Sequence, residues 1–222
     1  MICLALIGFT VSSLATDKTE LDNQIQTLLG KLEAMQQKPD KRVPFKNLRN
    51  AQGVILLNRT KAGFIFAYQG GGGVAMVKDP KTKHWGPVAF VSANEASLGF
   101  QVGGEQSFFV ILLMNTNATR LLTEPNFQFS GEARGTAGDT SAGEEGKVNP
   151  EPAVLVYGDR QGLYGGAAIK GGAITPDDKA NRAYYDEFVT MRDVLFGKKV
   201  KPTDGAKALA KKLDEYSKKP KE

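Results

Sequence analysis

Apolar residues recur at helical intervals near the start of the chain and define its first predicted element. They form one stripe between residues 17 and 37, made of Leu21, Ile25, Leu28, Leu29, Leu32 and Met35. Asp17 and Glu20 have the spacing of a capping box, and Pro39 marks the end, so we predict a helix over residues 17–37. The polar face of this helix is mainly acidic. That charge favours packing of the stripe on the protein core over its insertion into an anionic membrane.

A different pattern begins in the middle of the chain, where two apolar runs flank four consecutive glycines, Gly70–Gly73. Before the glycines, Phe64, Phe66 and Tyr68 occupy every second position, as on one face of a strand. After them, residues 74–78 continue the alternation. Glycine permits a tight turn or the close approach of another group, so we expect this run to form a hairpin or a bulge.

Other short apolar runs, bounded by turn-forming residues, predict further strands. With the two beside the glycines, the expected strands cover residues 54–58, 63–68, 74–78, 85–91, 97–102, 108–114, 153–157 and 162–169. Helices are expected at residues 45–52, 115–123, 178–196 and 204–217. Strands in the middle and helices at the ends predict an α+β fold. Connections without crossover helices predict a largely antiparallel, glycine-rich sheet, curled or closed into a barrel, with flanking N- and C-terminal helices.

The first fifteen residues carry no charge and are typical of a secretory signal peptide. Ser13-Leu14-Ala15 resembles a small-x-small cleavage site, although no basic residue precedes the apolar core. The segment is too short to span a bilayer, which takes about 20 apolar residues. We therefore expect export to the periplasm or the extracellular space, with the mature protein peripheral to a membrane. Cys3, the only cysteine, would leave with this segment, so the mature protein would form no disulfide.

Charge is unevenly placed along the chain, whose formal net charge is +5. Residues 38–61 hold seven basic residues against one acid, and residues 198–222 hold nine lysines against four acids. The remainder of the chain is acidic. Two basic segments on a mildly acidic protein indicate an anionic partner such as phospholipid headgroups or nucleic acid, although a basic tail is more often a solvated surface.

The usual arrangements of catalytic residues are missing from the sequence. His84 is the only histidine and follows a polar turn, so neither a histidine-based triad nor a histidine-rich metal site is expected. Residues 74–76 after the glycines predict a strand instead of the helix that a phosphate-binding loop requires. Aromatic residues 64–68 lack the interleaved cations of a nucleic-acid surface. We therefore expect no enzyme activity, no cofactor, no metal and no nucleic-acid partner.

Several motifs, taken in order, resemble the SYLF domain family from about residue 44 to about residue 202. They are Lys61-Ala-Gly-Phe, the glycine run with Val74, Trp85-Gly-Pro-Val-Ala, Gly99-Phe-Gln-Val-Gly-Gly104, Phe109-Val-Ile-Leu, Gly162-Leu-Tyr-Gly-Gly166 and Asn181-Arg-Ala-Tyr-Tyr185. Each motif alone is weak, whereas their order and spacing together are specific. The resulting division is a signal peptide (1–15), an N-terminal helical segment (16–43), a SYLF-like domain (44–202) and a basic C-terminal helix or tail (203–222).

The resemblance implies a lipid-binding module. Eukaryotic members look like membrane-associated proteins that bind phosphoinositides or phosphatidic acid, and a yeast branch also binds actin filaments. Bacterial members are often exported single-domain proteins without a defined role. Lipid binding in the family is associated with the basic N-terminal part, and the matching positions here are Lys41, Arg42, Lys46, Arg49 and Lys61. The actin activity is not expected of an exported protein.

Three functions are compatible with the sequence, and the first is the leading one. It is a non-enzymatic protein of the cell envelope that binds anionic phospholipid through basic residues. The alternative is a carrier that encloses a hydrophobic small molecule inside the sheet, lined by Phe64, Phe66, Trp85, Phe100 and Phe108. A hydrolase that uses paired carboxylates ranks below both.

Overall fold

The fold is described from a computed structural model of the 222-residue chain. The structure describes residues 17–62, 66–98, 105–124, 127–128, 153–159, 162–164 and 173–219. The expected signal peptide, and Phe64 and Phe100, lie outside these ranges.

One antiparallel sheet organises the described residues, with the strand order β5-β8-β3-β2-β1-β4-β6-β7. Its strands are β1 (Gly53–Ala62), β2 (Phe66–Val77), β3 (Ala89–Leu98), β4 (Glu105–Leu113), β5 (Phe127–Gln128), β6 (Val154–Gly158), β7 (Gly162–Tyr164) and β8 (Ala173–Pro176). The pairings among the described strands are all antiparallel, as predicted. β5 and β7 are the two edge strands, and no pairing among the described residues joins them, so the sheet is open and the alternative of a barrel is wrong.

The glycine run does not form the predicted hairpin turn or bulge. Gly70–Gly73 lie inside β2, paired with Thr60–Leu57 of β1 on one side and with β3 on the other. The two strands expected around the glycines are therefore one strand. The expectation of a close approach is correct, because a Cβ at Gly73 would overlap the Leu56 carbonyl oxygen of β1.

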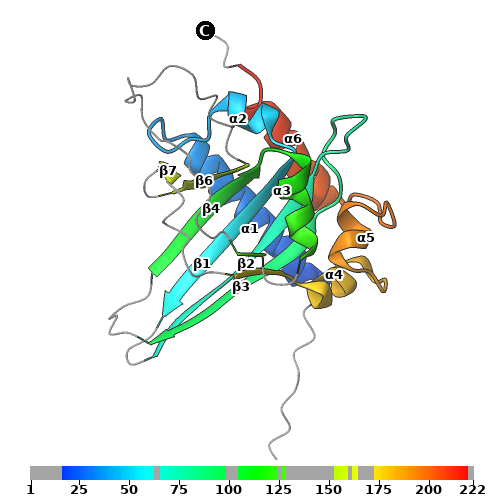
Figure 1. The fold of residues 1–222 in the computed structure, drawn as a ribbon, viewed down its shortest axis with the longest axis horizontal. Helices are drawn as coiled ribbons and strands as arrows, with labels where there is room; N and C mark the ends of the chain where they lie inside the picture. The colour runs from blue at the N-terminus through cyan, green and yellow to red at the C-terminus, as the bar shows by residue number, and fades with distance from the viewer. Residues whose placement is uncertain are drawn as a thin grey trace, which may run out of the picture.

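Helices cover both faces of the sheet (Figure 1). The described helices are α1 (Lys18–Gln36), α2 (Phe45–Asn50), α3 (Thr116–Arg120), η1 (Leu121–Thr123), α4 (Asp178–Tyr185), α5 (Met191–Leu195) and α6 (Asp204–Tyr216). Asp17 and Asn115 accept hydrogen bonds at the N-termini of α1 and α3, as the sequence predicts. Helices at both ends of an antiparallel sheet confirm the α+β class.

The two faces of the sheet contact different sets of helices, because alternate residues of each strand point to opposite sides. Leu56, Val74 and Val110 belong to one buried cluster with the residues of α1, α2 and α6. Leu57, Ala75 and Ile111 belong to a second cluster with residues of α3 and α5. The apolar stripe of α1 is buried in the first cluster, which confirms packing on the core as its role in the fold.

The helix expected at residues 178–196 is interrupted. Asp186 ends α4 in the left-handed conformation with φ of 53°, and α5 begins only at Met191. Thr190 and Asp193 form a capping box that starts α5. That Thr-x-x-Asp spacing is visible in the sequence and is the signal that the single-helix prediction missed.

Two predicted strands also differ from those observed. Trp85 forms only an isolated bridge with Lys78, and the strand expected from residue 85 starts at Ala89. The strand expected at residues 97–102 has its first two residues at the end of β3. Polar and proline residues between Lys78 and Val88 form the turn that delays β3.

Candidate functional site

The basic residues predicted as lipid contacts gather mainly around α2, at one end of the molecule. Lys46 and Arg49 are exposed on this helix, and Arg42 is exposed in the turn before it. Lys41 precedes Arg42 and is half-buried. The structure therefore brings four of the five predicted residues to one end of the fold.

Lys61 lies elsewhere. It is near the far end of β1, where its backbone pairs with Gln69 and Glu105. A strand rises about 3.3 Å per residue, so Lys61 is separated from the start of β1 at Gly53 by roughly 25 Å. A single headgroup therefore cannot contact Lys61 and α2 together.

A groove of about 710 Å³ lies beside α2, and we call it the basic groove. Its lining comes from both ends of the chain: Gln36, Pro39, Arg42, Val43, Pro44 and Phe45, and then Glu215, Tyr216, Lys218 and Lys219. Figure 1 shows why these segments meet, since the C-terminal end of α6 lies next to α2. The C-terminal lysines were part of the predicted basic tail, but nothing in the sequence placed them beside Arg42.

Local hydrogen bonds fix the turn that carries Arg42. The backbone N–H of Arg42 donates to the carbonyl of Lys38 at 2.9 Å. The Gln36 side-chain oxygen accepts from the Val43 backbone N–H at 2.7 Å, which holds the chain against the end of α1. Arg42 therefore projects from an ordered turn.

Glu215 is the carboxylate among the residues that line the basic groove, and it has a cationic partner. Glu215 forms an ion pair with Lys212 at 3.2 Å, and Lys212 also contacts Glu33 of α1 at 3.1 Å. The hydrogen bond with Glu33, followed by that with Glu215, raises the pKa of Lys212, so this lysine stays charged. Arg42, Lys218 and Lys219 outnumber Glu215 among the lining residues, so the lining of the groove has a net positive charge.

Aromatic rings border the same cations. The Arg49 guanidinium lies 5.5 Å from the centre of the Phe45 ring, within cation–π range. Tyr216 is half-buried on the other wall, and its burial raises the pKa of the phenol. The site combines fixed positive charge with partly accessible rings, a composition that suits the interface between headgroups and acyl chains.

Lys78 holds α2 onto the sheet. Its ammonium donates to the carbonyls of Leu48 and Arg49 at 3.2 and 2.9 Å and lies 4.5 Å from the centre of the Trp85 ring. Burial lowers the pKa of Lys78, although the Asp214 carboxylate opposes that shift. This cation satisfies the C-terminal carbonyls of a short helix and so fixes where Lys46 and Arg49 project.

Two of the residues proposed for an internal carrier cavity, Trp85 and Phe108, do not line the basic groove. Trp85 and Phe108 are buried in the cluster beneath α1 and α6. The side chain of Phe66 is outside the described set, as are Phe64 and Phe100. His84 is exposed in the turn before β3, away from the basic groove.

Two kinds of feature are absent from the described residues. None of the helices there combines the length and apolar character needed to cross a membrane. Within the same residues, no three or more His, Cys, Asp and Glu side chains are grouped so that they could hold a metal ion.

Comparison with known proteins gives a consistent group of relatives. Residues 94–216 match the Ysc84 family, described as "Las17-binding protein actin regulator". The chain is 30% identical over 185 residues to the SH3 domain-containing YSC84-like protein 1 of Xenopus laevis, covering 82% of this chain and 55% of that protein. The human protein of the same name is 29% identical, with 82% of this chain and 53% of its own length covered.

A yeast relative extends the group. Protein YSC84 of Saccharomyces cerevisiae is 29% identical over 169 residues, covering 73% of this chain and 36% of the yeast protein. The chain spans about half the length of the vertebrate relatives and about a third of the yeast one. No solved structure matches it. The description of the Ysc84 family is that of a binding regulator and names no enzymatic reaction.

Proposed function

Because the chain belongs to the Ysc84 family, which is the SYLF family of the sequence resemblance, we propose that it is a non-enzymatic lipid-binding protein. It associates with anionic phospholipid through the end of the molecule that carries α2 and the basic groove. The observation that supports this proposal is the meeting of two basic segments, far apart in the sequence, at one groove.

The expected interaction is electrostatic. Each basic residue near an anionic membrane surface contributes about 1 kcal/mol. Arg42, Lys46, Arg49 and Lys218 together would therefore contribute about 4 kcal/mol at low salt, a gain in affinity on the order of a thousandfold. Such an interaction weakens as the Debye length shortens. Phe45 and Tyr216, beside these cations, would add contact with the interfacial region of the bilayer.

Vesicle co-sedimentation tests the proposal. The protein is expected to sediment with vesicles of phosphatidylcholine that contain phosphatidylglycerol or phosphatidic acid, and to be released as salt increases. Pure phosphatidylcholine vesicles should leave it in the supernatant. Equal sedimentation with neutral and anionic vesicles would refute the proposal.

A pair of matched charge reversals locates the surface. Replacing Lys46 and Arg49 by Glu should lower the affinity for anionic vesicles by at least about thirtyfold, since two attractive charges become repulsive. The control replaces Lys179 of α4 and Lys207 of α6 by Glu, two exposed lysines that do not line the groove. The control has the same change in net charge, so equal losses in both variants would mean that net charge alone drives binding.

We further propose that this protein acts in the cell envelope after export, as the uncharged N-terminal segment predicts. Mass spectrometry of the protein recovered from periplasm and medium would test this, with an N-terminus at Thr16 as the expected result. Recovery only from the cytoplasm with Met1 retained would contradict it.

A second candidate function is binding to a protein partner. The family description and the yeast relative named LAS seventeen-binding protein 3 favour it. Co-sedimentation with actin filaments separates the two candidates directly. An exported lipid-binding protein is expected to stay in the supernatant, whereas saturable sedimentation with filaments would favour the second candidate.

A further inference from the structure

A second hollow, separate from the basic groove, lies between the turn after β2, helix α3 and the segment that follows α5. It has a volume of about 490 Å³, within the range of small-molecule sites. We call it the Lys81 cleft. Helix α2 stands between the two hollows, because Phe45 at its start lines the basic groove and Gln52 just beyond its end lines the Lys81 cleft.

The inner lining of the Lys81 cleft is apolar. Val77, Leu195 and Val200 line it and are buried in the second core cluster. Phe196 also lines it, and this ring is 39% exposed, one of few large apolar side chains in the described residues that the fold leaves in water. Covering such surface is favourable, so the cleft suits an apolar ligand group.

The rim of the cleft is cationic. Three lysines line it, Lys78, Lys81 and Lys198, against one carboxylate, Asp79. Asp79 is already satisfied, since it accepts from the backbone N–H groups of Lys81 and Thr82 and pairs with Lys198 at 3.0 Å. The Lys78 ammonium is engaged by the end of α2. Lys81, whose side chain is exposed, is the cation placed to meet an anionic group.

An ion pair connects two walls of the Lys81 cleft in the absence of a ligand. The pair between Asp79 and Lys198 links the turn after β2 to the segment after α5, across the cleft. Lys198 adopts the left-handed conformation with φ of 54°, so the chain turns sharply at this contact. A preformed cavity loses less entropy on binding than one that must assemble.

We propose that the Lys81 cleft binds a monomeric anionic amphiphile, with its apolar chain against Leu195, Phe196 and Val200 and its anionic head at Lys81. The ligand class is a single alkyl chain that bears a carboxylate or a phosphate. This goes beyond association with a membrane surface, since it concerns one molecule held in a cavity distinct from the basic groove.

Calorimetry and amide NMR of the full chain would test the proposal, with decanoate, decyl phosphate and neutral decanol as probes below their aggregation concentrations. Both anions are expected to bind saturably with one site, and amide shifts should centre on residues 79–87 and 194–202. Decanol should bind more weakly. No saturable binding of either anion, or shifts confined to the basic groove, would overturn the proposal. The relative affinities of the two anions distinguish a fatty acid from a lysophospholipid as the source.

Three variants locate the site. Lys81→Glu should weaken decanoate binding by about tenfold, the loss expected for one charge-assisted contact. Lys83→Glu is the matched control, because Lys83 is exposed in the same turn and does not line the cleft. Thr116→Trp, at an exposed lining position, should block the cavity while leaving the melting temperature unchanged. Equal effects of Lys81→Glu and Lys83→Glu, or full binding by Thr116→Trp, would contradict the assignment.

The outcome is independent of the membrane proposal. Replacing Lys46 and Arg49 by Glu should strongly weaken vesicle binding and leave the decanoate affinity unchanged. Thr116→Trp should prevent decanoate binding and leave the vesicle affinity unchanged. The two proposals are therefore tested by separate measurements, and the failure of one does not contradict the other.

Discussion

Two glycines of β2 determine how closely this strand approaches strand β1 and helix α1. Gly72 and Gly73 are neighbours in β2 and point to opposite faces of the sheet. A Cβ at Gly73 would overlap the Leu56 carbonyl oxygen, part of the β1 backbone. A Cβ at Gly72 would meet Gln24 Nε2 of α1 at 2.6 Å, and that amide is the end of a flexible side chain. The two positions therefore differ in what must move.

Replacing each of these two glycines by alanine should lower the free energy of unfolding by different amounts. Gly73→Ala is expected to lower the free energy of unfolding by about 1–3 kcal/mol, because backbone must shift. Gly72→Ala should cost less than about 1 kcal/mol, since Gln24 rotates away and the unfolded chain loses entropy. Urea denaturation of both variants measures the difference. Equal costs would mean that Gln24 is as fixed as the backbone.

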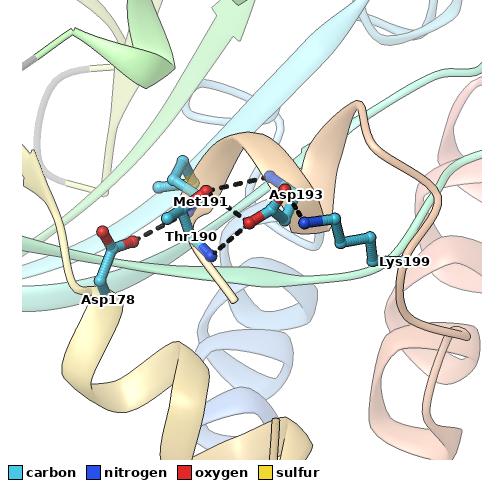
Figure 2. A network of polar contacts seen from close by, with 5 residues as sticks. All are labelled: Asp178, Thr190, Met191, Asp193 and Lys199. Atoms are coloured by element: carbon cyan, nitrogen blue, oxygen red, sulfur yellow. Dashed lines mark hydrogen bonds and ion pairs between the residues drawn. The ribbon is translucent and has the colours of Figure 1, made fainter. Parts of the chain in front are cut away.

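At the scale of elements, the corner between α4 and α5 is held by carboxylates (Figure 2). Asp178 of α4 accepts from the backbone N–H of Met191 at 2.8 Å, which joins the two helices. Asp193 accepts from the Thr190 backbone and hydroxyl at 3.1 and 2.9 Å and contacts Lys199 at 2.8 Å. These contacts close the capping box that separates α5 from α4.

Asp193 should make the stability of this corner depend on pH in the acidic range. The hydrogen bond from Lys199, with those from Thr190, lowers the pKa of Asp193 to about 2, against about 3.9 in an unfolded chain. A carboxyl group with a lowered pKa in the folded state contributes stability above its unfolded value. That contribution is lost as pH falls from about 4 to about 2.

The test compares thermal unfolding of the wild-type protein with Asp193→Asn across this window. The wild-type melting temperature should fall more steeply between pH 4 and pH 2 than that of the variant, and the two should converge at the acidic end. Asp40→Asn, in an exposed surface turn, is the control and should follow the wild type. Parallel curves for the wild type and Asp193→Asn would exclude this contribution.

At the scale of the whole molecule, α1 and α6 lie on the same face of the sheet and bring the two ends of the described chain together. Tyr184 of α4 strengthens this arrangement, because its hydroxyl donates to Asp22 of α1 at 2.6 Å and lies 2.7 Å from the Thr203 hydroxyl at the start of α6. The basic groove exists only because these helices meet.

The C-terminal lysines should therefore act with the residues before α2. Lys218→Ala with Lys219→Ala is expected to reduce affinity for anionic vesicles by about 2 kcal/mol, on the order of thirtyfold at low salt. The melting temperature should stay unchanged, since both residues are exposed.

The matched pair is Lys207→Ala with Lys211→Ala, exposed lysines of α6 that do not line the groove. It should retain most of the affinity. Equal losses of vesicle affinity in the two double variants would show that binding does not depend on the groove.

Much of the fold follows from local patterns. The sequence predicts the stripe of α1, the cap at Asp17 and a strand at residues 153–157, found at Val154–Gly158, because each depends on neighbours within a few residues. The single-helix prediction for residues 178–196 failed because the capping box at Thr190 outweighed a continuous apolar pattern. The glycine run was misplaced in a turn, since sequence alone does not say whether a close approach comes from a turn or from a neighbouring strand.

The sequence by itself determined many of the helices and strands, the antiparallel α+β class, the segregation of basic residues and the family. These depend on short-range periodicity, on composition and on the order of motifs. Tertiary structure alone decided that Arg42 meets Lys218 at one groove, that Lys61 stands apart, and that Lys81 borders an apolar cleft. The physical reason is that packing of α1, α2 and α6 on one face of the sheet sets distances between residues that no local pattern relates.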